Sequence, residues 1–300
     1  MLGAACVILL AVLELGSTYI VKHNSVTYVR VSRQYAEAVK IRPAPPGEPL
    51  SVLMVGNSLL LYGVDVEQLQ EQTSSRFQVY PIFMEGAGYF DWLYGLRRLF
   101  LRGSRPQVIV MGLEAYSILN NGVWDETPML LLNSRDVLGL ASELGLDRTA
   151  TSDLLLSHLS VYWGMRSLFR RRIISHLIPH YEDLVPFLRP DDLTLPQSRN
   201  VQPTIISRLE TLRELCEANG AKMILVIPPT FFSENAVKQM AIASQKAGVE
   251  AIVPIEPTML PARFYQPDYI HLNPQGAVRF TSALAAELPK TIVVVTNRSL

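Results

Sequence analysis

A serine at the end of an apolar run is the first residue of this sequence that could do chemistry. Ser58 follows "SVLMVGN", and a second apolar run, "LLLYGV", comes directly after it. A hydroxyl at the start of a helix lies near unpaired backbone N–H groups. Serine is a weak nucleophile, however, unless a neighbouring base removes its proton. Ser58 therefore needs a histidine at the same place, or it is a simple turn residue.

One of the five histidines meets this need. His271, in "QPDYIHLNPQGA", lies between the last expected core strand and the last expected helix, while the other four lie near the N-terminus or within 115–203. Asp268 precedes His271 by three residues, so its carboxylate could bond and orient the imidazole and stabilise its cation. The alternatives are a structural loop histidine and an acid that only forms a turn.

Alternating strand and helix patterns must position these residues. Apolar runs predict buried strands at 51–56, 77–83 and 107–112, and helical spacing predicts helices at 65–75 and 90–101. Strands that are apolar on both faces are typical of parallel sheets covered by helices. The sequence therefore predicts a doubly wound α/β sheet.

The same alternation returns in the last third of the chain. It predicts a helix at 204–220, a strand at 221–229, a helix at 234–248, a short strand at 250–255 and a helix at 273–288. Asn273 is the expected N-cap of the last helix, and "TIVVV", 291–295, reads as an edge strand. Ligands of such folds bind at the carboxyl ends of the strands, which is where Ser58 and His271 are expected.

The domain boundaries follow from composition. Residues 1–21 are mostly apolar, carry a single charge, Glu14, and are about long enough to cross a bilayer as a single-pass anchor. A signal peptide and a buried helix are the alternatives. Residues 22–49 form a juxtamembrane segment, expected to be helical up to about 42, and a Pro-rich linker, "RPAPPGEP". Residues 50–300 form the α/β domain, interrupted by a mostly helical insertion at 115–203.

Two motifs at opposite ends of the α/β domain carry a family resemblance. "VGNSLLLYGVD" and "PDYIHLN" resemble the first and last sequence blocks of the SGNH (GDSL-type) hydrolase superfamily. The resemblance covers about 51–114 and 204–288. It implies a flavodoxin-like three-layer α/β/α sandwich with a parallel sheet, and ester hydrolysis or acyl transfer.

The resemblance also implies a role for individual residues. Ser58 matches the nucleophile, and its backbone N–H would donate to the oxyanion of the reaction. His271 matches the base and Asp268 the acid that orients it. Gly88, or else Gly86, matches the glycine whose N–H is the second oxyanion donor.

The chain departs from the superfamily pattern at two positions. Asn57 stands where an aspartate is usual, which is a mild change because both residues cap turns. Glu114 stands where the superfamily has an asparagine whose side chain donates to the oxyanion, and an ionised carboxylate cannot donate. Asn120 or Asn121 could take over this role; otherwise the loss of one donor costs a factor of about 10²–10³ in turnover.

Composition excludes several classes of function. The chain has 27 basic and 27 acidic residues, which gives no general indication of nucleic-acid binding. Cys6 and Cys216 have no metal-site spacing, and no phosphate loop or dinucleotide motif is present. We therefore expect no metal and no cofactor. The segment "RSLFRRRIISH" could lie on anionic lipid headgroups, hold an anionic substrate or be a solvated basic face.

The resemblance, together with the apolar N-terminal segment, implies a membrane-anchored serine esterase or O-acyltransferase that acts on acyl esters, such as those of envelope polysaccharides, because the superfamily includes tethered enzymes of this kind. Its partners would be the lipid bilayer, an acyl ester or polysaccharide and an envelope-assembly protein. Basic residues follow the apolar segment and none precedes it in the sequence. By the positive-inside rule this would place the domain in the cytoplasm, whereas the resemblance favours an extracytoplasmic site. The alternatives are a non-catalytic envelope scaffold or carbohydrate-binding protein, and a lipid esterase.

Overall fold

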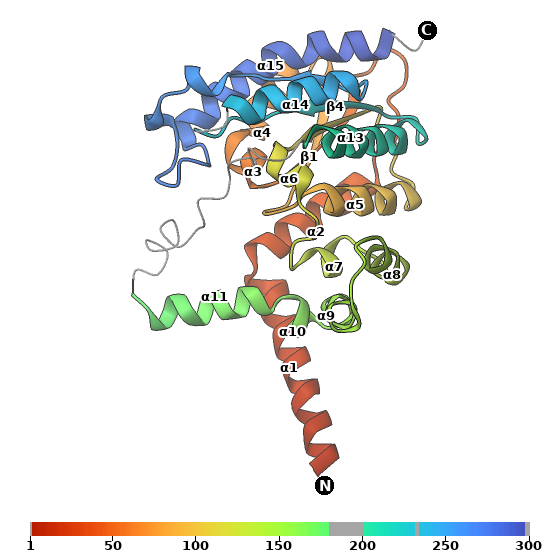
Figure 1. Ribbon diagram of the computed structural model, residues 1–300, viewed down its shortest axis with the longest axis vertical. Helices are drawn as coiled ribbons and strands as arrows, with labels where there is room; N and C mark the ends of the chain where they lie inside the picture. The colour runs from red at the N-terminus through yellow and green to blue at the C-terminus, as the bar shows by residue number, and fades with distance from the viewer. Residues whose placement is uncertain (1, 180–200, 232–233, 298–300) are drawn as a thin grey trace. The chain divides into compact units, whose positions relative to one another are not determined.

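The computed structural model describes residues 2–179, 201–231 and 234–297 (Figure 1). The chain divides into two compact units. One comprises Met1–Arg33 and Asn121–Arg189, and the other comprises Gln34–Asn120 and Pro190–Leu300.

The second unit contains a parallel sheet of five strands. The strands are β1 (Leu50–Gly56), β2 (Phe77–Phe83), β3 (Val108–Gly112), β4 (Lys222–Val226) and β5 (Glu250–Ile252). Their order is β2-β1-β3-β4-β5, and every neighbouring pair is parallel. This is the flavodoxin-like order, in which the chain winds first to one side of β1 and then to the other. The predicted fold class is confirmed.

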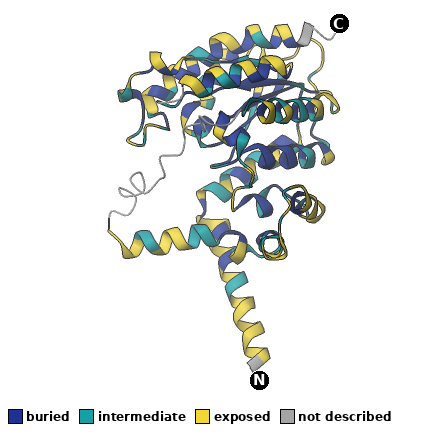
Figure 2. Cartoon of the chain, in the orientation of Figure 1, coloured by how far each residue is buried: buried dark blue, intermediate teal, exposed yellow. Residues whose placement is uncertain are grey.

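Helices cover both faces of this sheet. α4 (Val66–Thr73) and α15 (Pro274–Asn297) pack together on one face, and α5 (Tyr89–Leu101), α13 (Gln202–Glu217) and α14 (Glu234–Lys246) pack together on the other. The three inner strands, β1, β3 and β4, are almost wholly buried between them (Figure 2). Side chains of the inner strands meet Phe280 and Leu284 of α15 in one apolar core. The short helices α3 (Ser58–Gly63) and α6 (Ala115–Leu119) follow β1 and β3.

The expectation of an edge strand at 291–295 is wrong, because α15 continues through these residues to Asn297. Their β-branched composition favours a strand, yet their apolar contacts follow the helix. Leu288, Ile292 and Val295 all pack against the core, at intervals of four and three residues. This spacing places them on the inner face of one continuous helix.

The segment before the sheet is more ordered than a linker. α2 spans Val26–Val39, and its last residues belong to the sheet unit. Gln34 accepts a hydrogen bond from the Phe83 amide at 3.2 Å, and the Ala38 carbonyl accepts one from Ser104 at 2.7 Å. Ile41, just after the helix, is buried. The predicted helical character of this segment is confirmed, although α2 ends at Val39, three residues before the expected end.

All secondary-structure elements among the described residues of the first unit are helices. The unit contains α1 (Leu2–Asn24), α7 (Thr127–Leu130), α8 (Ser134–Glu143), α9 (Arg148–Leu159), α10 (Val161–Gly164) and α11 (Arg166–Leu177). The expected helical character of the insertion is confirmed for the part that the structure describes. Residues 180–200 of the insertion lie outside the described residues.

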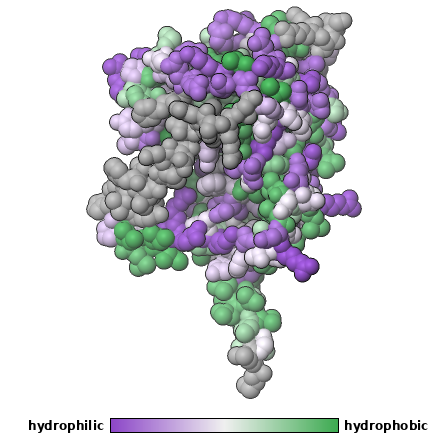
Figure 3. All heavy atoms as spheres, viewed as in Figure 1, coloured by the Kyte–Doolittle hydropathy of each residue, from purple (hydrophilic) through white to green (hydrophobic). Residues whose placement is uncertain are grey.

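α1 is long and apolar enough to cross a membrane. Its apolar side chains, among them Val7, Leu10 and Leu15, are exposed rather than packed in a core (Figures 2 and 3). Its one acid, Glu14, accepts hydrogen bonds from the Ser160 hydroxyl and the Val161 amide, both at 2.7 Å. The carboxylate of α1 is therefore hydrogen-bonded to the N-terminal end of α10.

Candidate active site

Ser58 lies at the junction of β1 and α3. β1 ends at Gly56, and Asn57 caps the helix by accepting a hydrogen bond from the Leu59 amide at 2.9 Å. Ser58 is thus the first helical residue, directly beyond the carboxyl end of an inner strand. The prediction of a strand followed by a helix or turn at this serine is confirmed.

Two glycines let α3 lie close to the sheet. The buried Leu60 side chain rests over Gly56 and Gly112, the last residues of β1 and β3. A Cβ atom on Gly112 would lie 2.2 Å from Leu60 Cδ1, and one on Gly56 would lie 2.8 Å from the same atom. The two glycines and Leu60 therefore set the height of Ser58 above the sheet edge.

A short ordered loop presents the histidine. The Asp268 oxygen Oδ1 accepts hydrogen bonds from the Ile270 and His271 amides, at 2.9 and 3.0 Å. Tyr269, between them, has a φ of 55°, a left-handed backbone that is uncommon outside glycine. The His271 carbonyl accepts a hydrogen bond from the Gln266 amide at 2.7 Å. These contacts fix the backbone from which the imidazole projects.

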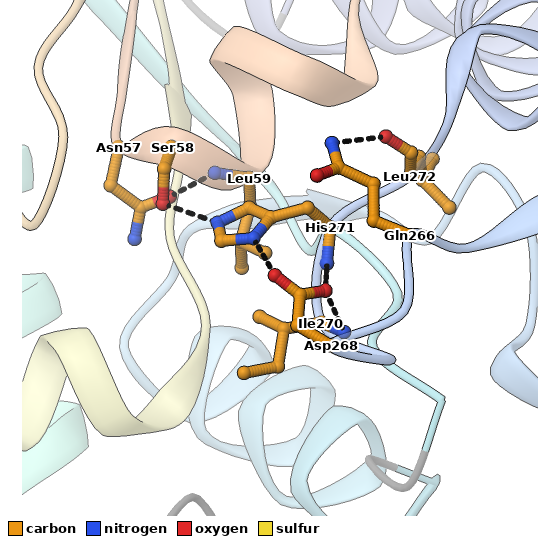
Figure 4. A network of polar contacts seen from close by, with 8 residues as sticks. All are labelled: Asn57, Ser58, Leu59, Gln266, Asp268, Ile270, His271 and Leu272. Carbon is orange, nitrogen blue, oxygen red and sulfur yellow. Dashed lines mark hydrogen bonds and ion pairs between the residues drawn. The ribbon is translucent and has the colours of Figure 1, made fainter. Parts of the chain in front are cut away.

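The structure brings Ser58, His271 and Asp268 together in a chain of hydrogen bonds (Figure 4). His271 Nε2 lies 2.8 Å from Ser58 Oγ, and His271 Nδ1 lies 2.6 Å from Asp268 Oδ2. His271 is buried, and Ser58 is partly exposed. A nucleophile, a base and an acid that orients the base are therefore in contact, as a serine triad requires.

The environment keeps Asp268 ionised. Burial raises the pKa of this carboxyl, but the hydrogen bonds from the His271 side chain and amide and from the Ile270 amide outweigh burial and lower the pKa to about 2. The carboxylate is therefore negative at any pH at which the protein works. It can orient His271 and stabilise the imidazolium without taking the proton itself.

Tyr62 is a site residue that the sequence reasoning missed. Its ring meets the His271 ring edge to face, with centroids 5.1 Å apart and an angle of 70°. Tyr62 lies four residues after Ser58 in α3, and this spacing places both on one helix face. The spacing was the available signal, and it identifies Tyr62 as a wall of the imidazole site.

The backbone N–H of Gly88 already makes a hydrogen bond in the structure. Its amide donates to the Asp91 carboxylate at 2.7 Å and so closes the first turn of α5. A Cβ atom at Gly88 would lie 2.6 Å from the Ser117 carbonyl oxygen, so a glycine is needed here for close packing. Gly86 lies in the turn before α5, with a φ of 72°. In the structure Gly88 caps α5, a role that was not expected from the sequence.

Glu114 supports the turn that carries the nucleophile. It caps α6, accepting hydrogen bonds from the Ser117 amide at 3.0 Å and from the Ser117 hydroxyl. It also accepts one from Asn57 Nδ2 at 3.0 Å, while Asn57 Oδ1 caps α3. The carboxylate at this position therefore holds Asn57, the residue before Ser58. Among the described residues, no cluster of His, Cys, Asp and Glu could hold a metal ion.

Comparison with known proteins gives only distant matches. No family model and no curated protein matches the chain. The solved structures that resemble it include TesA, at 13% identity and a TM-score of 0.41, over 79% of this chain and 97% of that one. Another is LAE5, an α/β hydrolase from the metagenome of Lake Arreo, Spain, at 12% identity and a TM-score of 0.43, over 80% and 95%. A variant of Axe2, an acetyl xylan esterase from Geobacillus stearothermophilus, matches at 10% and 0.43, over 80% and 95%. The function therefore has to be argued from the site.

Proposed function

We propose that this chain is a serine ester hydrolase or O-acyltransferase of SGNH type. The observation that carries the proposal is the hydrogen-bonded chain from Ser58 through His271 to Asp268. A hydroxyl bonded to an imidazole whose other nitrogen is bonded to a carboxylate is an activated nucleophile. The site lies at the carboxyl ends of the parallel strands, where folds of this order bind their ligands.

The chemistry has two halves. Ser58 Oγ attacks the ester carbonyl while His271 Nε2 takes the hydroxyl proton. The tetrahedral intermediate then expels the alcohol, which receives that proton from His271, and an acyl group stays on Ser58. In the second half water attacks the acyl-enzyme and releases the acid. If a sugar hydroxyl attacks instead, the acyl group is transferred to it.

The developing oxyanion needs donors. The Ser58 amide is in the first turn of α3, where N–H groups have no partner within the helix. We propose this amide as the first donor. Gly88 could act as a second donor only if its amide bonded the oxyanion in addition to the Asp91 carboxylate, or in place of it. Glu114 stays a support for Asn57 and makes no contact with the oxyanion.

The substrate and location form a further part of the proposal. α1 is proposed as a membrane anchor, which is supported by its length and by the exposure of its apolar side chains. Together with the superfamily resemblance this favours acyl esters of an envelope polysaccharide, outside the cytoplasm, as the substrate. No cofactor is required, because the three side chains supply the nucleophile, the base and the charge.

The test uses the full chain in mild detergent and a fluorophosphonate probe, in which Ser58 Oγ would displace fluoride at phosphorus. Mass spectrometry then identifies the labelled residue. We expect labelling at Ser58 that disappears in Ser58→Ala and falls strongly in His271→Ala. Serine-dependent hydrolysis of an acetyl ester should accompany it. No labelling of the folded chain would overturn the acyl-enzyme mechanism.

One observation favours a second candidate, a non-catalytic envelope scaffold or carbohydrate-binding protein. At the two positions where the superfamily has its additional oxyanion donors, this chain has an occupied amide, Gly88, and a carboxylate, Glu114. This candidate predicts saturable glycan binding that Ser58→Ala leaves unchanged, with no labelling by the probe. The two functions thus give opposite results in the same experiment.

A further inference from the structure

Two adjoining hollows lie beside the end of α1 in the helical unit. The larger, about 780 Å³, is formed by residues of α1 and α11, and the smaller, about 340 Å³, lies along α11 and the start of α2. They share Asn24, Arg172 and Ser175. The two hollows together are called the α11 groove below.

The lining of the α11 groove is divided between apolar and cationic side chains. Ile20, Ile173 and Leu177 line the larger hollow. Arg171 and Arg172 line the smaller one, and Arg172 reaches both. No acid is among the residues that line either hollow. This combination suits a molecule with an anionic head and an apolar tail.

One buried acid, Glu126, interacts electrostatically with Arg171. Glu126 is buried, and burial raises the pKa of its carboxyl; the Ser167 hydroxyl donates to it at 3.0 Å. The positive charge of Arg171 acts in the opposite direction and lowers this pKa. Glu126 lines neither hollow, whereas Arg171 and Arg172 do.

The position of the α11 groove on α1 indicates which anion it meets. α1 has 23 residues, about 34 Å of helix, and a bilayer has a hydrocarbon core of about 30 Å. The groove lies at the carboxyl-terminal end of α1, beside Asn24, where a spanning helix would leave the hydrocarbon. Ile173 and Leu177 on α11 are 60% and 71% exposed, and apolar atoms cover α1 and the end of α11 in Figure 3.

We propose that the α11 groove binds an anionic phospholipid of the membrane that α1 crosses. The phosphate lies against Arg171 and Arg172, and the first carbons of an acyl chain lie along Ile20, Ile173 and Leu177. The groove holds the helical unit at the headgroup level through one bound lipid. This inference rests on α1 as a membrane anchor and is independent of the hydrolase reaction.

The test measures which lipid the full chain retains. The protein in mild detergent is equilibrated with equal amounts of phosphatidylglycerol and phosphatidylcholine, freed of micelles, and its bound lipid is quantified by mass spectrometry. We expect phosphatidylglycerol to be enriched. An arginine at a lipid surface contributes about a fivefold change in binding, so Arg171→Gln with Arg172→Gln should reduce the enrichment by about 25-fold.

Matched variants keep the test specific. Arg135→Gln with Arg148→Gln removes two exposed arginines from other helices of the same unit and should leave the enrichment unchanged. Arg171→Lys with Arg172→Lys retains the charge and should retain most of the enrichment, which excludes misfolding as the cause of its loss. The thermal unfolding midpoint of each variant is measured in parallel.

Two results would overturn the proposal. Equal retention of both lipids by the unaltered chain would show that the α11 groove selects no anionic lipid. Displacement of the lipid by glycerol phosphate, which has no acyl chain, at the same concentration would show a site for a soluble anion. Failure of the fluorophosphonate to label Ser58 would leave both results unaffected.

Discussion

The two carboxylate oxygens of Asp268 accept different hydrogen bonds. Oδ1 accepts the Ile270 and His271 amides and fixes the loop, and Oδ2 accepts the His271 ring N–H and fixes the imidazole. One side chain thus shapes the backbone that carries the base and also sets the tautomer of the base. The two tasks can be separated by a substitution that retains one oxygen.

Asp268→Asn is that substitution. The amide oxygen can still accept the two backbone N–H groups, but its NH₂ group would face His271 Nδ1 and favour the wrong tautomer. We expect turnover of an acetyl ester to fall by about 10⁴, with the fold retained. Initial rates and the thermal unfolding midpoint measure the two effects. Asp147→Asn, at the N-cap of α9 in the other unit, is the matched control and should retain full activity.

The low pKa of Asp268 also makes stability depend on pH. The pKa lies near 3.8 for an ordinary aspartate and at about 2 here. Because the pKa is lower in the folded state, ionised Asp268 stabilises the fold above about pH 4, and this contribution is lost as pH falls towards 2. The difference in unfolding midpoint between the unaltered chain and Asp268→Asn should therefore shrink between pH 4 and pH 2. A difference that stays constant over this range would contradict the assignment.

The meeting of Ser58, His271 and Asp268 could be predicted from the sequence because each lies beside a recognisable element. Ser58 follows an apolar strand, and Asp268 and His271 precede a capped helix. The role of Gly88 could not be predicted from the superfamily pattern alone. The relevant signal was local: an acid three residues after a glycine at a helix start can close the first turn through the glycine amide, and Asp91 does so.

At the scale of elements, the height of α3 above the sheet decides whether Ser58 meets His271. Leu60 fills the space that side chains on Gly56 and Gly112 would occupy. A change at these glycines would therefore move the helix rather than only fill a gap. Gly63, at the end of the same helix, has ordinary contact distances of 3.7 Å at its Cβ position.

Gly112→Ala tests this arrangement. Its new methyl group would meet Leu60 at 2.2 Å and displace α3, so we expect the rate of fluorophosphonate labelling at Ser58 to fall by about 10². Gly63→Ala adds the same methyl group to α3 itself and should label at nearly the normal rate. Equal rates for the two variants would show that α3 does not depend on Leu60 for its position.

The end of α15 offers a second test of an element. Ile292 is 1% exposed, whereas Val293, the next residue, is 54% exposed. Ile292→Ala should lower the free energy of unfolding by about 2–5 kcal/mol, and Val293→Ala should change it by less than about 0.5 kcal/mol. Denaturant unfolding measures both. Similar losses for the two variants would be inconsistent with the buried face of the helix.

The strands of the core could be predicted because buried parallel strands are continuous apolar runs, and those at β1 and β3 contain almost nothing else. The end of α15 could not, because five residues of "TIVVV" give no period by themselves. The period becomes visible only when Leu288 is included, which lies on the far side of Pro289. A proline inside a helix is uncommon, and it made a boundary the more natural interpretation.

At the scale of the whole molecule, the apolar helix α1 is bound to the insertion through a carboxylate. Glu14 accepts hydrogen bonds from the Ser160 hydroxyl and from the Val161 and Tyr162 amides, the last at 3.3 Å. A segment 146 residues further along the chain thus completes the polar contacts of α1. This bonding gives the one carboxylate of α1 its hydrogen-bond partners.

Glu14→Gln should loosen this junction. The amide NH₂ group would face N–H donors, and the loss of acceptor bonds costs about 1–3 kcal/mol. We expect trypsin to cleave the arginine-rich helix α11 faster in the full chain in detergent. Leu15→Ala, at the next and exposed position of α1, is the control and should leave the cleavage rate unchanged. An unchanged rate in Glu14→Gln would show that other contacts hold the insertion to α1.

The distance along the chain between Ser58 and His271 has a consequence for biosynthesis. The two residues that touch in the site are 213 residues apart. At synthesis rates of about 5–20 residues per second, His271 leaves the ribosome about 10–40 s after Ser58. During that time Ser58 lacks both His271 and Asp268, whereas α1 has already left the ribosome. The proposed nucleophile therefore gains its base only near the end of synthesis.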